Sequence, residues 1–429
     1  MMNISRLRNN NRTRGRDLVT TLSMTAAALL ALSSMDQSSS QVQAFSFSDI
    51  KLPGLTSSSF RRTLGEPVQH APVQVPADCL KYSADDLEKD KAHPCHPKRL
   101  EAVYYPGGKS KIDAPIIGVL TQPYGYGSKA EENDTYSSDD LEDSFIATSH
   151  VSFLEAAGAR VVPVNYRSSY NQLIGTLKQI NGIYIPGDSA LILQNKKYMA
   201  TLSTVYEWAQ DQNVKSTNHF PIMAVSYGFL AMIKPYLYEE GKYLENLPVT
   251  LIDQSVPLNL RSKPADSFLY DDFTLKEADD MLDTVNFYNE LNQGIRLGNF
   301  LKKQKPLARV FSPILTFHND RNDQNLEFVA AIEGSDHPIW GIAFSIEKIQ
   351  HNIDMQIEEK VDHGRKAVAE AQRIANFFVD EARLSGHKYR NRKEEAAALI
   401  DNFDAMIAEK DVQWTSNSSN KIMEVYLFK

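Results

Sequence analysis

Apolar and polar positions fall into a regular pattern from residue 114 onward. Continuous apolar runs of strand length, typical of buried parallel strands, lie at 115–121, 160–164, 180–185 and 221–225. Between them, helices are predicted at 144–157 and near 196–211. Strands that alternate with helices predict a parallel sheet with helices on both faces. Ligands bind such sheets at the carboxyl ends of the strands, here Thr121, Pro186 and Val225.

Two of the predicted helices carry a clear apolar face. In the helix 144–157, that face consists of Ile146, Ala147, His150 and Leu154. A longer helix, 361–384, has an apolar stripe formed by Val368, Ala371, Ala375, Phe378, Val379 and Ala382. This spacing indicates core packing rather than a cofactor site. Further strands are predicted at 248–253, 309–317, 327–333 and 339–345, and a polar tail is expected to close the chain.

The first 44 residues resemble a targeting leader. A stretch rich in arginine precedes an apolar run, and Val42-Gln43-Ala44 offers a small-x-small cleavage site. This pattern predicts the secretory pathway, with the mature protein outside the cell or in a lysosome or vacuole. A mitochondrial leader is the alternative, because the segment is rich in Arg and Ser and has no acid before Asp17. After the leader, no run of about 18 apolar residues predicts a membrane span.

Only two cysteines, Cys79 and Cys95, occur in the chain. In an oxidising compartment they predict one disulfide. A metal site that uses Cys79 and the run His93-Pro94-Cys95-His96 is the alternative, but its spacing fits no common zinc module. We therefore favour the disulfide and expect neither a metal nor a cofactor.

Composition divides the chain into three parts: a leader at 1–44, an N-terminal extension at 45–112 and one domain at 113–429. The extension is rich in Pro, Ser and charge, and an acidic insert at 125–143 follows the first strand. Because 42% of the 429 residues are hydrophobic, a sizeable core is expected. The net charge of −8 argues against nucleic acid or an anionic membrane surface as the main partner.

The fourth strand runs directly into Ser226-Tyr227-Gly228. A strand that turns sharply into a helix and displays one side chain at the turn has the form of a nucleophile elbow. A serine after a buried strand is more often an ordinary helix cap, so this motif alone is a weak indication of catalysis.

Several segments in the same order resemble γ-glutamyl hydrolases, over about three-quarters of the chain. They are 114–122, 144–163, 180–187, 220–229, 336–348 and 377–383. The resemblance implies a class I glutamine amidotransferase-like (flavodoxin-like) fold, a three-layer α/β/α sandwich with a mostly parallel central sheet. It also implies a folate polyglutamate or other γ-glutamyl ligand, because family members cleave γ-linked glutamate from folates. Family members are often homodimers, a state that this sequence neither supports nor excludes.

The chain departs from the family pattern at the residues that carry the chemistry. Ser226 stands where the family has its nucleophilic Cys in Gly-Thr-Cys-Leu-Gly-Phe, and Tyr227 follows it. Ser345 stands at the histidine of Gly-x-x-x-His-Pro-Glu-Lys, whereas the third catalytic position keeps Glu347. The oxyanion-binding Pro-Gly-Gly reads Pro186-Gly187-Asp188. The Asp188 carboxylate either faces the pocket and opposes an oxyanion or points outward and caps the next helix.

A serine hydroxyl needs a general base, and a second serine cannot serve as one near neutral pH. We therefore expect a pseudoenzyme that binds a ligand, or a protein partner through 45–112 or 125–143. A slow serine hydrolase with His363 as a substitute base is one alternative, and a structural subunit of a larger assembly is another.

Overall fold

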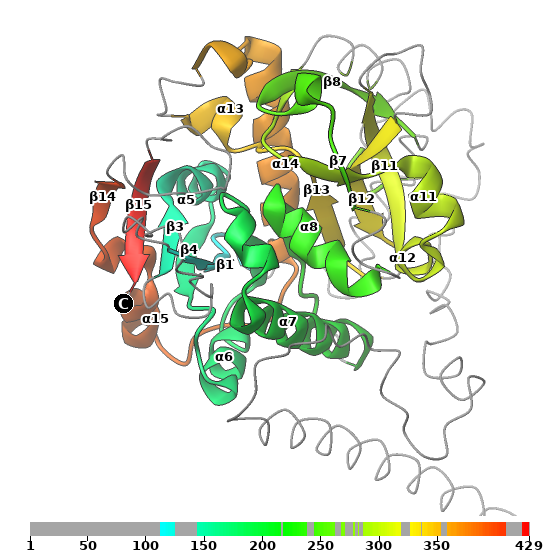
Figure 1. Cartoon of the computed structure of the whole chain (residues 1–429). Helices are drawn as coiled ribbons and strands as arrows, with labels where there is room; N and C mark the ends of the chain where they lie inside the picture. Colours follow the sequence, from blue (N-terminus) through cyan, green and yellow to red (C-terminus); the bar gives the residue numbers. More distant parts are fainter. Residues whose placement is uncertain are drawn as a thin grey trace, which may run out of the picture. The chain divides into compact units, whose positions relative to one another are not determined.

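A nine-stranded sheet with the order β4-β1-β5-β6-β13-β12-β11-β8-β9 forms the centre of the fold (Figure 1). A computed structural model describes residues 112–124, 144–215, 218–237, 244–261, 267–270, 278, 282, 286–318, 327–335, 337–352, 358–408 and 423–428. The parallel strands of this sheet are β4 (Arg160–Val164), β1 (Ile116–Leu120), β5 (Gly182–Ile185), β6 (Ile222–Val225) and β13 (Ile339–Ile342). Antiparallel strands extend it on one side: β12 (Glu327–Gly334), β11 (Phe311–His318), β8 (Gln254–Leu260) and β9 (Asn286–Asn289).

Helices cover both faces of this sheet. On one face, α5 (Thr148–Glu155), α13 (Lys348–His351) and α14 (Arg365–Arg383) contact one another. Helix α7 (Lys196–Lys215) connects β5 to β6 and α8 (Tyr227–Ile233) follows β6, so right-handed crossovers place them on the opposite face (Figure 1). The predicted α/β fold, a helix-covered sheet with parallel strands at its centre, is thereby confirmed.

Smaller elements complete the fold. Two further sheets contain β14 (Ala405–Ala408), β15 (Met423–Phe428), β3 (Ser144–Ala147) and β2 (Gln122–Pro123) in one, and β10 (Gln293–Ile295) and β7 (Leu244–Asn246) in the other. The remaining α-helices are α6 (Tyr170–Leu177), α11 (Leu297–Lys302), α12 (Lys305–Val310) and α15 (Arg392–Ala398). The short 3-10 helices are η4 (Ala190–Leu193), η5 (Lys234–Tyr236), η6 (Val249–Leu251), η9 (Glu358–Lys360) and η10 (Ile400–Asn402).

Burial accounts for the parallel half of the sheet. Strands β1, β5, β6 and β13 are buried along their whole length, which is why they read as unbroken apolar runs. The predicted stripe of α14 also packs inward: Ala371, Ala375, Phe378, Val379 and Ala382 are buried, and Val368 is half-buried. The strands at 160–164 and 180–185 and the helices at 196–211 and 361–384 are therefore confirmed, with small shifts of their ends.

Three sequence-based expectations are wrong. Residues 144–147 begin no helix but form strand β3, because they pair with β15. Residues 248–253 contain the 3-10 helix η6, and the strand starts at Gln254. The segment after α14 is not a plain polar tail, since it contributes α15, β14 and β15.

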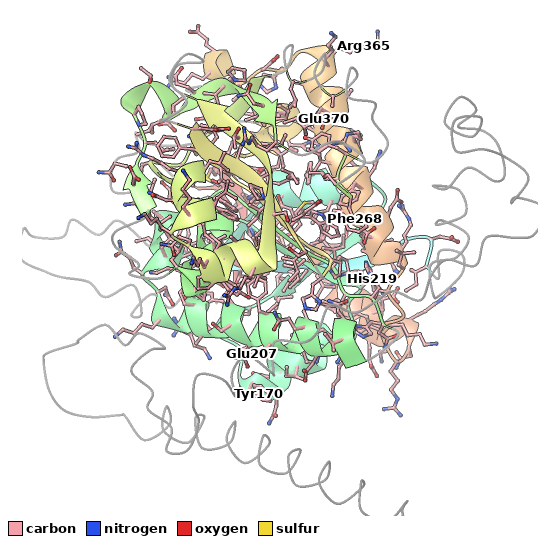
Figure 2. The ribbon with its side chains drawn as sticks, turned by 90° about the vertical axis from the view of Figure 1, so that its right-hand side faces the viewer. Tyr170, Glu207, His219, Phe268, Arg365 and Glu370 are labelled. Atoms are coloured by element: carbon pink, nitrogen blue, oxygen red, sulfur yellow. The ribbon has the colours of Figure 1, made fainter. Side chains whose placement is uncertain are left out.

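One segment beside the long helix is held by an arginine. Arg373 on α14 donates to the carbonyl of Leu269 at 2.5 Å and lies 4.7 Å from the centre of the Tyr270 ring. Figure 2 shows Phe268 beside this helix, on which Arg365 and Glu370 are labelled. The contact fixes residues 267–270 against the face of the fold that carries α5 and α14.

Several predicted features lie outside the described residues: the leader 1–44, nearly all of the extension 45–112, the insert 125–143, and both cysteines, Cys79 and Cys95. The division at residue 112 and the disulfide stay predictions. None of the described helices has the length and apolarity needed to cross a membrane.

The turn after β6 has the backbone of a nucleophile elbow. Ser226 has φ 50° and ψ −125°, in a region that a residue with a side chain rarely adopts. Two glycines allow the segment that follows β5 to approach this turn closely. A Cβ on Gly228 would lie 2.3 Å from the carbonyl oxygen of Ile185, and one on Gly187 would lie 2.3 Å from the amide nitrogen of Tyr227. The end of β5 and the start of α8 are thus in backbone contact.

We expect the substitution Gly228→Ala to destabilise the protein by about 3 kcal/mol or more, because the new methyl group meets backbone atoms that cannot move aside. Gly175→Ala in α6 is the matched control, since a Cβ there meets nothing within 4 Å and alanine favours a helix by about 0.5–1 kcal/mol. Urea unfolding midpoints measure both effects. Equal midpoints for the two variants would contradict the close approach.

Candidate active site

Neighbouring parallel strands bring the predicted residues to one edge of the sheet. Ser226 follows β6, Asp188 lies three residues after β5, and Ser345 lies three residues after β13. Gln122, just after β1, completes this row. Because β1, β5, β6 and β13 are adjacent and parallel, their carboxyl ends meet, as expected for a ligand site in such a sheet.

Ser226 is buried, and its hydroxyl has no hydrogen-bond partner among the described residues. Its amide donates to the carbonyl of Ile342 at 2.8 Å, which ties the elbow to the end of β13. The predicted substitute base, His363, is exposed, and its Nδ1 contacts the carbonyl of Ile349 at 2.8 Å. No imidazole in the described part of the chain therefore hydrogen-bonds to the Ser226 hydroxyl.

Ser345 takes part in a different contact. Its hydroxyl donates to Oε2 of Glu290 at 2.6 Å, and the ammonium group of Lys348 donates to Oε1 of the same carboxylate at 2.5 Å. The amide of Ser345 also donates to the carbonyl of Tyr288 at 2.9 Å. Ser345 is thus a hydrogen-bond donor within a buried ionic network.

The Asp188 carboxylate points inward. Its Oδ2 accepts from Nε2 of Gln122 at 2.6 Å and lies 2.8 Å from Nε2 of His150. The next helix, η4, is capped instead by Ser189, whose hydroxyl accepts from the amide of Leu191 at 3.2 Å. Of the two orientations open from the sequence, the structure has the buried one.

Two backbone amides beside the elbow are already used within the protein. The amide of Asp188 donates to Oε1 of Gln122 at 2.8 Å, and the amide of Tyr227 donates to the carbonyl of Gly187 at 3.3 Å. In an elbow, the amide after the nucleophile and an amide from a neighbouring loop commonly bind the oxyanion. In this arrangement both of those donors have acceptors of their own.

His150, on α5, lies between two carboxylates. Its Nε2 contacts Asp188 as described, and its Nδ1 lies 3.2 Å from the Tyr184 hydroxyl and 3.8 Å from Oε2 of Glu347. Burial opposes protonation of His150, but the charges of Asp188 and Glu347 outweigh it and raise its pKa. Burial also opposes ionisation of Asp188, yet His150 and Lys348 hold the pKa of that carboxyl below its ordinary value. Both shifts favour the charged forms, an imidazolium beside a carboxylate.

Other titratable groups at the site respond differently to burial. Burial raises the pKa of Glu347 above that of an ordinary carboxyl, and His150 and Lys348 offset this only in part. Burial also raises the pKa of the Tyr227 phenol, so this group stays protonated near neutral pH. For Lys348, the carboxylates of Glu290 and Asp188 outweigh burial and raise the ammonium pKa. Lys348 thus remains a cation inside the fold.

Sequence reasoning did not assign site roles to Gln122, His150, Tyr184, Glu290 and Lys348. A signal existed for two of them. Gln122 directly follows Thr121, a predicted strand end, and His150 is the one titratable residue on the apolar face of a predicted helix. Glu290 carried no such signal, because it reaches Ser345 across 55 residues of sequence.

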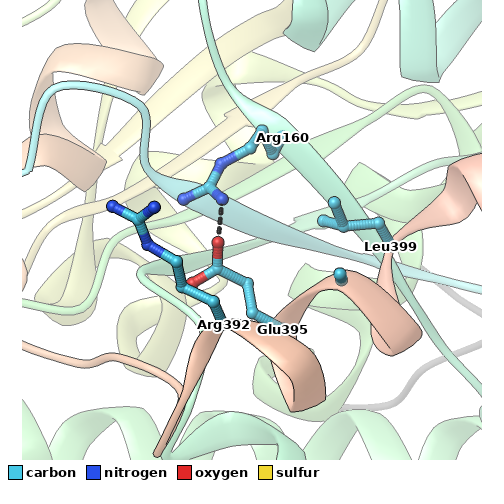
Figure 3. Close-up of a pocket in the computed structure, with 5 residues that line it drawn as sticks. Arg160, Arg392, Glu395 and Leu399 are labelled. Atoms are coloured by element: carbon cyan, nitrogen blue, oxygen red, sulfur yellow. Dashed lines mark hydrogen bonds and ion pairs between the residues drawn. The ribbon is translucent and has the colours of Figure 1, made fainter.

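A separate pocket lies between the start of β4 and α15, lined by Arg160, Arg392, Glu395, Ala396 and Leu399 (Figure 3). Arg160 pairs with Glu395 and also donates to the carbonyl of Ala114 at 2.9 Å. None of the predicted site residues lines this pocket. It is therefore distinct from the edge of the sheet where Ser226 lies.

The chain is similar to γ-glutamyl hydrolases from several organisms. It is 30% identical over 292 residues to that of Bos taurus, covering 67% of this chain and 83% of that protein. It is 29% identical over 318 residues to that of Homo sapiens (73% and 89%), and 27% identical over 316 residues to γ-glutamyl hydrolase B of Dictyostelium discoideum (74% and 83%). No family model matches the chain.

Among solved structures, PurLQS from Thermotoga maritima is similar with a TM-score of 0.33 and 13% identity, covering 60% of this chain and 97% of that one. The family assignment rests on the sequence relationship, since the bovine protein is 30% identical and is covered to 83% of its length. On this relationship, the chain belongs to the γ-glutamyl hydrolase family.

Proposed function

We propose that this protein is a catalytically silent γ-glutamyl hydrolase relative, which binds a γ-glutamyl ligand such as a folate polyglutamate without cleaving it. Membership in the family supports the ligand class. The observation that carries the loss of activity is the Ser226 hydroxyl, which has no hydrogen-bond acceptor among the described residues. A serine that cannot pass its proton to a base is a poor nucleophile.

The neighbouring groups do not supply this base. Ser345 donates a hydrogen bond to Glu290, Tyr227 is a protonated phenol, and Nε2 of His150 is already in contact with Asp188. Glu347, the retained third member of the family pattern, contacts His150 rather than a histidine at position 345. Loss of a nucleophile–base unit lowers kcat by about 10⁶, or about 8 kcal/mol of barrier.

The engaged amides at the elbow support the same proposal. An oxyanion would have to displace Gln122 from the amide of Asp188 and Gly187 from that of Tyr227. Each missing oxyanion donor typically costs about 10²–10³ in kcat. The nearby Asp188 carboxylate carries a negative charge, which opposes the negative charge of an oxyanion.

The strained turn at Ser226 favours a second candidate, the slow serine hydrolase. A positive φ at a serine costs about 1–3 kcal/mol, and catalytic elbows have this conformation. A purely structural subunit remains the third alternative. For protein partners, residues 45–112 and 125–143 are the segments we propose, and secretion directed by residues 1–44 is the compartment we propose.

We expect no release of glutamate when the purified protein is incubated with a poly-γ-glutamyl folate, because Ser226 lacks a base. The human enzyme serves as the positive control, and liberated glutamate is measured by mass spectrometry. The variant Ser226→Ala should give the same trace as the wild type. Turnover that disappears in Ser226→Ala would establish the slow serine hydrolase instead.

The double variant Ser226→Cys with Ser345→His should remain inactive, because the elbow amides and the Asp188 carboxylate still oppose an oxyanion. Hydrolysis by this variant would show that the rest of the site is intact and would contradict that expectation. Ser226→Cys with Ser345→Asn is the matched control. Alkylation of the introduced thiol at position 226 is mapped by peptide mass. A thiol that is not alkylated is inaccessible, whereas one that is alkylated is accessible but does not hydrolyse the substrate.

Binding without cleavage should appear as thermal stabilisation by the intact ligand. A poly-γ-glutamyl folate at 100 times its Kd stabilises a protein by about 2.7 kcal/mol. The matched control ligand is an α-linked oligoglutamate of the same length, which should raise Tm less. Equal shifts for both ligands, or no shift for either, would favour the structural subunit.

A further inference from the structure

We propose that His150, Asp188 and Glu347 bind one divalent first-row transition-metal ion at the carboxyl ends of the parallel strands. One ring nitrogen and one oxygen from each carboxylate lie within 4.8 Å of one another, and all three residues are buried. This site differs from the sequence-based expectation of no metal. It is independent of whether the protein hydrolyses a γ-glutamyl bond.

The donor atoms suit such an ion. One imidazole nitrogen and two carboxylate oxygens favour Zn²⁺, Mn²⁺, Fe²⁺ or Co²⁺ over Ca²⁺ and Mg²⁺, which prefer oxygen ligands alone. Ligands at about 2.0–2.2 Å from a shared ion lie about 3 Å apart. Nε2 of His150 and Oδ2 of Asp188, at 2.8 Å, already meet this spacing. Oε2 of Glu347 lies 3.8 Å from Nδ1 of the same ring, so the Glu347 side chain has to move to share an ion held by Nε2.

Two carboxylate oxygens at this cluster point to a ligand. Oδ1 of Asp188 and Oε2 of Glu347 are buried and have no hydrogen-bond partner among the described residues. Both side chains are only 1% exposed. A buried carboxylate oxygen that lacks a donor is costly, and the His150–Asp188 contact uses only Oδ2. A bound cation would compensate the buried negative charge of both carboxylates.

The charges around the cluster favour a cation. The carboxylates of Asp188, Glu347 and Glu290 face the ammonium group of Lys348, which already pairs with Glu290. With a neutral His150 and an ionised Glu347, these four groups sum to a charge of −2, which one divalent ion neutralises. The ion and the imidazolium proton are then alternative occupants of the same nitrogen.

Outer contacts would orient the ligands. With Nε2 of His150 as the ligand, Nδ1 faces the Tyr184 hydroxyl at 3.2 Å, which fixes the ring. Gln122 donates to Oδ2 of Asp188 and accepts from the Asp188 amide. It therefore fixes both the side chain and the backbone of Asp188. This arrangement matches the second layer of contacts common to protein metal sites.

The direct test is titration of the full-length protein with Mn²⁺ after treatment with a chelator, at about pH 8 so that protons compete less. Loss of the free-Mn²⁺ electron paramagnetic resonance signal measures binding, and competition by Zn²⁺ shows a shared site. We expect one ion per chain. Failure of both ions to bind the wild-type protein at millimolar concentration would overturn the proposal.

Isosteric variants locate the ion. Asp188→Asn and Glu347→Gln should each weaken Mn²⁺ binding by more than about 100-fold, and Tyr184→Phe, which removes only an outer contact, by about tenfold. Glu333→Gln, a buried carboxylate on β12 outside the cluster, is the matched control and should bind as the wild type does.

Binding that persists in Asp188→Asn and Glu347→Gln would overturn the proposal, even if an ion is bound elsewhere. Loss of binding in Cys95→Ser alone would place the ion among His93, Cys95 and His96 and would overturn it equally. Since Mn²⁺ prefers oxygen and nitrogen donors to thiolates, it discriminates between the two places. Where a variant fails to fold, absence of Mn²⁺ binding to the wild-type protein still overturns the proposal.

Discussion

The backbone contact between Gly187 and Gly228 fixes the geometry on which the site depends. Because both positions lack a Cβ, the end of β5 lies directly against the first turn of α8. This contact holds Ser226 at its positive φ of 50° and brings Asp188, the residue after Gly187, to the elbow. Asp188 then fixes Gln122 and His150, and His150 in turn faces Glu347. A buried polar network of this kind is stabilising only while each member keeps its partners. The same contact therefore governs both the nucleophile position and the charges beside it.

The fold was predictable wherever burial alone decides the structure. Parallel strands buried on both faces must be apolar throughout, so β1, β5 and β6 are visible as runs, and α14 is visible as a stripe. Prediction failed where the structure of a segment depends on a partner that lies far away in the sequence. Residues 144–147 have a pattern that fits a helix, yet they pair with β15 far along the chain. Strand β8 begins only after η6 and alternates between buried and half-buried positions, so its start was misplaced.

The location of the site could be predicted from the sequence, but the contacts between its residues could not. The carboxyl ends of the strands and the resemblance to one family located Ser226, Ser345, Glu347 and Asp188 in the sequence. The partners of these residues come from elsewhere: Glu290 reaches Ser345, and His150 reaches Asp188 across 38 residues. Such pairs depend on tertiary packing, and no local pattern encodes them. The same reasoning gave His363 a role as base, whereas its Nδ1 contacts a backbone carbonyl.

Strand β15 has a consequence for how the protein is made. It pairs with β3, and Thr148 at the start of α5 donates to Glu424 at 3.0 Å across 276 residues. At a translation rate of about 5–20 residues per second, roughly 15–55 s separate the synthesis of these two partners. During that interval, β3 exposes an unpaired edge next to the helix that carries His150. An open strand edge can pair with other chains, and the closure of this sheet has to wait until β15 has been synthesised.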